Sequence, residues 1–284
     1  NNMNTIEYSK ITANSRIALV FDVETNGLLD MKKSASSRVL EESPYVLQLS
    51  YAMYDMYHQT LIKTVDTYIK IPEHVDVPAE TTKINGITRE MCDTKGVPML
   101  DVLLAFYKDY HMTTVCVAHN YRFDSAMINI EYQRHWAVLR DTHPYALNLF
   151  QLTYMRHLNM RYKCTMMDGQ YICKIPKPVR EVPQIMKTPI PAPPTPTSDN
   201  IKPAPSLQIE LPVLNIDLPI MTTPVKKGYK WPTLVELYTF YFKKAPTGMH
   251  NSMMDVLVTL QCYLMMENSN PIQENEFMEM ARKI

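Results

Sequence analysis

The pattern of hydrophobic and polar positions predicts alternating strands and helices over the first part of the chain. Residues 17–21 form a continuous apolar run, which is typical of a strand buried on both faces. Residues 46–55 alternate between apolar and polar side chains, which predicts a half-buried strand. Residues 61–70 follow after a short link and complete a hairpin. A further apolar run at 114–118 predicts a fourth strand.

Apolar positions spaced three and four residues apart predict longer helices. Four segments have this spacing, at 97–110, 123–136, 233–243 and about 251–267. The stretch 138–175 is ambiguous, although we expect a fifth strand to end within 165–168. The order of these elements predicts an α/β fold in which helices flank a mixed β-sheet of about five strands.

Prolines interrupt this pattern between residues 176 and 228, where thirteen of the 21 prolines fall. Because proline lacks an amide donor and fixes φ, this stretch cannot form a helix or a central strand. Residues 189–196 indicate extended polyproline II. We interpret 176–228 as a disordered or loosely packed insertion. It is either a linker or, through the repeated motif at 209–212 and 216–219, a docking segment for a protein partner.

Composition narrows the class of protein. The 284 residues are 46% hydrophobic, which is enough for a globular core, and 29 basic and 29 acidic residues give no net charge. This balance excludes a protein that wraps nucleic acid by bulk positive charge. The five cysteines contain no CxxC pair, which predicts free thiols. No apolar run approaches the ~20 residues of a membrane span, so we expect an intracellular protein, of cytoplasm, nucleus or a virus, with no membrane partner.

Two carboxylates mark the end of the first predicted strand. Asp22 and Glu24 lie two positions apart, so their side chains point to the same side of the strand. Buried carboxylates are costly unless they are paired or bind a metal, and their oxygens are the ligands that Mg²⁺ and Mn²⁺ prefer. The alternative is an ordinary strand end followed by a polar turn at 25–27.

A second polar cluster follows the strand predicted at 114–118. It contains His119, Asn120 and Asp124 and leads into the next helix. Each has an ordinary structural alternative: His119 can be structural, Asn120 can cap the helix, and Asp124 can interact with the helix dipole.

A third cluster, His250 and Asp255, precedes the last long helix. Five helical positions correspond to a rotation of about 140°, so His250 must lie on the loop if both side chains reach one site. The alternative is a capping box formed by Ser252 and Asp255.

In order and spacing, these three clusters resemble the DEDDh family of 3′–5′ exonucleases. This family has an RNase H-like fold and includes the proofreading epsilon subunit of bacterial DNA polymerase III. The segments that carry the resemblance are 22–27, 83–88, 118–124, 231–237 and 250–255. The resemblance implies a single exonuclease domain over 1–284. Its core would cover about 16–175 and 229–267, with the insertion 176–228 and a C-terminal tail at 268–284.

The resemblance also implies roles for individual residues. Two Mg²⁺ or Mn²⁺ ions would be held by four carboxylates, Asp22, Glu24, Asp124 and Asp255, and His250 would be the general base. Four further residues would contact the substrate: Thr25, Leu28, Asn120 and Phe123. The expected reaction is hydrolysis of single-stranded nucleic acid, with DNA favoured, from the 3′ end to nucleoside 5′-monophosphates, as in DNA proofreading or repair.

Two alternatives stay open. The same site could belong to an exoribonuclease that trims RNA, because the sequence does not separate DNA from RNA. A catalytically silent module that binds nucleic acid, or a partner through 176–228, belongs to a different class, but the five intact site residues argue against it. Basic stretches at 161–187 and 225–244 could guide a phosphate backbone toward the site, or could be ordinary solvated surface.

Overall fold

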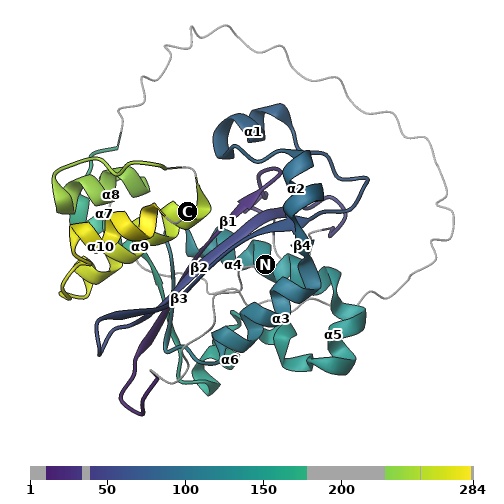
Figure 1. Cartoon of the computed structure of the whole chain (residues 1–284), viewed down its shortest axis with the longest axis horizontal. Coiled ribbons are helices and arrows are strands. Elements are labelled where there is room, and N and C mark those ends of the chain that lie inside the picture. Colours follow the sequence, from purple (N-terminus) through teal and green to yellow (C-terminus); the bar gives the residue numbers. More distant parts are fainter. Residues whose placement is uncertain (1–10, 34–38, 178–227, 250, 283–284) are drawn as a thin grey trace, which may run out of the picture.

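The computed structural model describes residues 11–33, 39–177, 228–249 and 251–282, which form a mixed sheet flanked by helices (Figure 1). The strands are β1 (Ile17–Thr25), β2 (Val46–Asp55), β3 (Thr60–Lys70), β4 (Val97–Pro98), β5 (Val115–Ala118) and β6 (Arg161–Cys164). Their spatial order is β4-β3-β2-β1-β5-β6. The β1–β2 and β2–β3 pairs are antiparallel, whereas β1–β5, β5–β6 and β3–β4 are parallel. The predicted RNase H-like α/β fold is confirmed.

Helices pack on both faces of this sheet. Those that follow β3 are α1 (Ala79–Asn85), α2 (Arg89–Lys95) and α3 (Met99–Tyr110). Those that follow β5 are α4 (Tyr121–Arg134), α5 (Trp136–Thr142), the 3-10 helix η3 (Pro144–Asn148) and α6 (Leu152–His157). The last are α7 (Thr165–Cys173), α8 (Leu234–Phe242), α9 (Ser252–Met266) and α10 (Glu274–Ala281).

β1 lies at the centre of the core because its alternate residues pack on opposite faces. Its odd-numbered apolar residues join a hydrophobic cluster with side chains of α3 and α4. Ala18 and Val20 instead join a second cluster with side chains of α8 and α9. The even-numbered positions of β1 therefore face α9. Because the side chains alternate, Asp22 and Glu24 point to the same side as Ala18 and Val20.

The predicted strands and long helices are confirmed, with ends that shift by a few residues. The expectation that β2 is half-buried is wrong, because all of its residues are buried. Its polar side chains have partners on β3: Gln48 and Ser50 each donate a hydrogen bond of 2.6 Å to Oδ1 of Asp66. The position expected for the fifth strand is also wrong. β6 ends at Cys164, and residues 165–168 form the first turn of α7.

The two chain segments that flank the Pro-rich insertion meet in the structure. They pair through an antiparallel bridge with two main-chain hydrogen bonds. Lys177 N–H donates to Gly228 O at 3.0 Å, and Lys230 N–H donates to Ile175 O at 2.9 Å. Residues 178–227, with the expected polyproline stretch and docking motif, lie outside the described residues. The chain thus leaves and re-enters the described fold at one place.

The predicted division into core, insertion and tail stays a prediction. In the segment 268–284, Ile272 and Phe277 are buried in the cluster that contains α9. The five cysteines are free, as predicted. Within the described part of the chain, no helix has both the length and the apolar character needed to cross a membrane.

Candidate active site

Three carboxylates converge where β1 ends and α9 begins. Asp22 and Glu24 continue the even-numbered face of β1, which packs against α9. Asp255 lies in the first turn of α9, as the sequence predicts. One carboxylate oxygen from each of these three residues lies within 4.8 Å of the others. The structure thus brings together three of the four predicted metal ligands in a single cluster.

Asp124 reaches the same place from the other side of β1. β5 is paired with β1 only as far as Val20 and Val117, and the chain then turns into α4. Beyond that point, the edge of β1 that paired with β5 lies next to the first turn of α4, while β2 stays paired with the opposite edge. Val23 N–H donates to Oδ1 of Asp124 at 3.2 Å, and Asp124 is buried. This hydrogen bond holds the fourth carboxylate, on α4, against the main chain of β1.

Burial and mutual repulsion raise the pKa values of three of these carboxyl groups, Asp22, Glu24 and Asp124. The pKa of Asp22 lies well above its usual value because of burial and the nearby charges of Asp124, Glu24 and Asp255. Burial also raises the pKa of Asp124, against the hydrogen bond from Val23. The pKa of Glu24 is raised to about 7, mainly by burial. Crowded carboxylates of this kind are stabilised by a bound cation. Since all the donors are hard oxygens, the residues fit Mg²⁺ or Mn²⁺.

Two polar side chains that the sequence analysis did not assign to the site support these carboxylates. Ser252 is fully buried and donates to the main-chain oxygen of Asp22 at 3.2 Å. The same hydroxyl is near the carboxyl of Asp22 and lowers its pKa, against the larger effect of burial. Asn85, at the end of α1, hydrogen-bonds to Glu24 and lowers its pKa. The only sequence signal for Asn85 was the family-like segment 83–88.

His250, the predicted general base, lies outside the described residues. The next residue, Asn251, caps α9, and its Oδ1 accepts a hydrogen bond from Met254 N–H at 3.2 Å. The capping box at Ser252, considered above as an alternative, is therefore wrong.

The four predicted substrate-binding residues differ in accessibility. Leu28 is 92% exposed, Asn120 is exposed and Phe123 is half-buried. Thr25 is buried at the bottom of its turn, where its hydroxyl donates to Gly27 O at 2.7 Å. Asn120 makes no side-chain cap hydrogen bond at the start of α4, so the alternative of a helix cap is wrong. Their contact with substrate stays a prediction.

His119 has a structural role. Its Nε2 lies 3.1 Å from Pro232 O and its Nδ1 lies 3.0 Å from the hydroxyl of Thr165. Because a carbonyl oxygen only accepts, Nε2 carries the hydrogen and Nδ1 accepts from the hydroxyl. Burial lowers the pKa of His119 to about 4, so the ring is neutral at pH 7. This residue connects the end of β5 to the start of α7 and to the segment that leads into α8.

A mixed sheet with carboxylates clustered at the end of its central strand fits an enzyme that binds divalent metal ions. Residues 19–170 match the protein family described as exonuclease (RNase_T), which is more than half of the chain. The chain therefore belongs to this exonuclease family. The resemblance to the 3′–5′ exonucleases and the expected enzyme class are confirmed at the level of the family.

Curated relatives agree with this assignment. The chain is 34% identical over 160 residues to the PolC-type DNA polymerase III of Streptococcus agalactiae serotype III (strain NEM316), which covers 54% of this chain and 10% of that protein. It is 32% identical over 145 residues to the PolC-type DNA polymerase III of Streptococcus pyogenes serotype M2 (strain MGAS10270), which covers 49% of this chain and 9% of that protein. The chain thus matches about a tenth of the length of these relatives.

Solved structures share the fold. Escherichia coli exonuclease I in complex with a dT13 oligonucleotide superposes with a TM-score of 0.51 and 16% identity, covering 88% of this chain and 41% of that chain. A further structure of exonuclease I has a TM-score of 0.54 and 14% identity, covering 93% and 43% of the two chains.

Proposed function

We propose that this protein is a metal-dependent 3′–5′ exonuclease that hydrolyses single-stranded nucleic acid, preferably DNA, to nucleoside 5′-monophosphates. The observation that carries this proposal is the cluster of Asp22, Glu24 and Asp255, whose oxygens lie within 4.8 Å of one another. Two comparisons support DNA as substrate: the relatives are named DNA polymerases, and the exonuclease I structure contains a deoxyoligonucleotide.

The four carboxylates would hold two Mg²⁺ or Mn²⁺ ions. Asp22, Glu24 and Asp255 would bind one, and Asp22 with Asp124 the other, Asp124 through water. A pair of bound divalent ions stabilises the attacking and leaving oxygens of phosphodiester hydrolysis. The protein keeps these side chains close together in spite of their repulsion. It does so through the packing of β1 against α9, the hydrogen bond from Val23 to Asp124 and the buried hydroxyl group of Ser252.

His250 would take the proton from the attacking water. An imidazole with an ordinary pKa, about 6.5, changes protonation near neutral pH, which suits a general base. In the sequence, His250 comes five residues before Asp255, the proposed metal ligand in the first turn of α9.

The substrate would enter with its 3′ end at the turn after β1. Leu28 and Asn120 offer accessible side chains there, and Thr25 and Phe123 would complete the pocket for the terminal nucleotide. The proposed protein partner would bind the insertion 176–228, which would connect the enzyme to a polymerase or to another nucleic-acid protein. An intracellular location belongs to the same proposal.

The proposal is tested with single-stranded DNA and RNA of equal sequence, labelled at the 5′ end and incubated with Mg²⁺, Mn²⁺ or EDTA. We expect a metal-dependent ladder that shortens from the 3′ end, faster on DNA. Asp22→Asn should abolish it, whereas Asp141→Asn, a matched change of a surface carboxylate that is 70% exposed, should not. Faster cleavage of RNA would identify an exoribonuclease. Absence of cleavage by the folded protein would contradict the proposal and favour a silent binding module.

A further inference from the structure

We propose that Asn26 is a positioning residue that holds α1 and the turn from Thr25 to Leu28 in one arrangement beside the carboxylate cluster. This inference rests on the proposed exonuclease function, because it gives Asn26 a part in binding the 3′ end of the substrate. Asn26 itself would touch neither the metal ions nor the reacting phosphate.

The hydrogen-bonding groups of Asn26 join three segments that are distant in sequence. Its Nδ2 donates to Asp76 O at 2.9 Å, in the loop before α1. Its Oδ1 accepts from Tyr45 N–H at 2.7 Å, and its own amide donates to Tyr45 O at 3.1 Å, just before β2. The hydroxyl of Thr81, in α1, donates to Asn26 O at 3.3 Å. The amide side chain of Asn26 thus donates through Nδ2 and accepts through Oδ1 at the same time.

Helix α1 depends on such contacts because it has no buried residue. A helix is usually held in place by an apolar stripe that faces the core. Here the hydrogen bond of Thr81 joins the first part of the helix to Asn26, and the side chain of Asn85 joins its last residue to Glu24. Helix α1 therefore borders the carboxylate cluster and is held there by polar groups.

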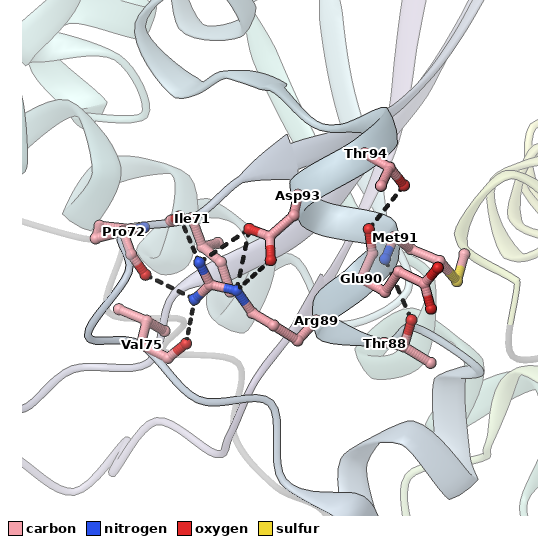
Figure 2. A network of polar contacts seen from close by, with 9 residues as sticks. All are labelled: Ile71, Pro72, Val75, Thr88, Arg89, Glu90, Met91, Asp93 and Thr94. Carbon is pink, nitrogen blue, oxygen red and sulfur yellow. Dashed lines mark hydrogen bonds and ion pairs between the residues drawn. The ribbon is translucent and has the colours of Figure 1, made fainter.

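The loop that leads to Asp76 is held by Arg89, whose contacts with Pro72, Val75 and Asp93 are drawn in Figure 2. Arg89 Nη1 donates to Pro72 O at 2.7 Å and to Val75 O at 2.6 Å. The guanidinium is oriented by Asp93, four residues later in α2, through hydrogen bonds of 2.9 to 3.1 Å. Since Asp76 directly follows Val75, the carbonyl that Asn26 contacts lies on an anchored loop.

The second partner of Asn26 is anchored as well. The guanidinium of Arg134, in α4, lies 3.6 Å from the centre of the Tyr45 ring. Arg134 also donates to Pro44 O at 3.0 Å. Asn26 thus connects two fixed points, and α1 with the turn after β1 takes its position from that connection. The turn carries Leu28, a predicted substrate contact that is 92% exposed.

Two variants break this connection on the α1 side. Asn26→Asp keeps an acceptor for Tyr45 N–H but sets a carboxylate oxygen against Asp76 O, where the donor was. Thr81→Val removes the hydroxyl that donates to Asn26 O and adds no charge. An effect that both variants share therefore does not result from the negative charge that the first variant introduces.

We expect Asn26→Asp to raise the KM for a short single-stranded oligonucleotide about 5- to 10-fold and Thr81→Val about 2- to 5-fold, as for the loss of one or two hydrogen bonds. The kcat should change less than about twofold in both variants, because the metal ligands stay on β1, α4 and α9. A purely structural role would lower the melting temperature without this division between KM and kcat.

Amide hydrogen exchange gives a readout that does not need activity. In Asn26→Asp, the amides of residues 79–86 should exchange faster, whereas those of β1 and α9 should not change. An active variant with an unchanged KM, or unchanged exchange in α1, would overturn the inference. If the wild-type protein cleaves no substrate, the proposed function fails, and exchange in α1 still decides whether Asn26 positions this helix.

Discussion

The two regions that border the candidate site, α9 and α1, are held in place by different forces. In α9 most residues are buried, and they form much of the hydrophobic cluster on one face of the sheet. In α1 no residue is buried, and its described contacts to the site are hydrogen bonds to Asn26 and Glu24. Figure 1 shows α9 beside α8 and α10 on one side of the strands, and α1 near the end of β1. Apolar packing thus fixes the carboxylates, whereas polar contacts fix the segment beside them.

This difference matters because the two regions have different tasks in the proposed function. Metal ligands must be held within a fraction of an ångström, which suits elements embedded in the core. A segment that admits and releases a polynucleotide end must open at low cost, and local opening is easiest where few apolar groups are buried. Perturbing each region should therefore change different measured quantities.

The largest effect is expected when a carboxylate of the cluster is neutralised. Asp255→Asn should lower the exonuclease rate at least ~10³-fold, because a lost ligand removes stabilisation worth several kcal/mol from the transition state. The melting temperature in EDTA should stay the same or rise, because Asp255 repels Asp22 and Glu24. Rates on a labelled oligonucleotide and thermal melting measure the two effects. A variant with activity within tenfold of wild type would remove Asp255 from the site.

A matched pair of truncations compares the two regions in stability. Leu257→Ala in α9, where the side chain is 1% exposed, should lower the free energy of unfolding by about 2–5 kcal/mol. Ile84→Ala in α1, where the side chain is 64% exposed, should change it by less than about 0.5 kcal/mol. Urea denaturation measures both. Similar losses in the two variants would show that α1 also depends on apolar packing.

The carboxylate cluster also predicts how stability depends on pH in EDTA. The pKa of Glu24 rises from 4.5 to about 7 on folding, so between these pH values the folded state binds more protons than the unfolded state. The free energy of unfolding should therefore fall as pH rises from about 4.5 to 7, and the raised pKa of Asp22 acts in the same direction. Saturating Mg²⁺ should reverse the trend. Melting curves recorded between pH 4.5 and 7 test this dependence. In Glu24→Gln, stability should change less with pH than in the wild-type protein. An equal change in both proteins would contradict the raised pKa of Glu24.

The smallest effect is expected from shortening the insertion. Because residues 177 and 228 are already joined by a main-chain hydrogen bond, replacing 178–227 by an Asn-Gly turn should leave the fold intact. We expect a melting temperature within a few degrees of wild type and cleavage of short oligonucleotides within about twofold. Thermal melting and the same nuclease assay measure this. An insoluble or molten variant would show that the segment contributes to the core.

The sequence predicts the long elements well because their apolar periodicity reflects burial. It also predicts the carboxylate cluster, since Asp22, Asp124 and Asp255 each lie where a core strand ends or a core helix begins. It does not predict α1, since a helix with no buried residue has no apolar period. The sequence predicts a half-buried β2 because its polar residues suggest a solvent-exposed face. Gln48 and Ser50 are instead buried and donate to Asp66 of β3, a partner that the sequence of β2 does not reveal.

The supporting residues are missed for a related reason. Asn85 and Ser252 each act on a carboxylate that is distant in sequence, so only the three-dimensional fold shows the contact. The boundary between β6 and α7 is misplaced because no glycine, proline or other turn residue separates Cys164, the end of the strand, from Thr165, the start of the helix.

The central claim is that Asp22, Glu24 and Asp255 form the metal centre of a nuclease. Crystals soaked in Mn²⁺ test it most directly, because the anomalous scattering of manganese locates the ion independently of any assumed site. We predict a strong peak that is coordinated by oxygens of all three carboxylates. The peak should be absent in Asp22→Asn crystals. The account would be contradicted if manganese bound to the wild-type protein only at other places and no anomalous peak appeared beside these three side chains.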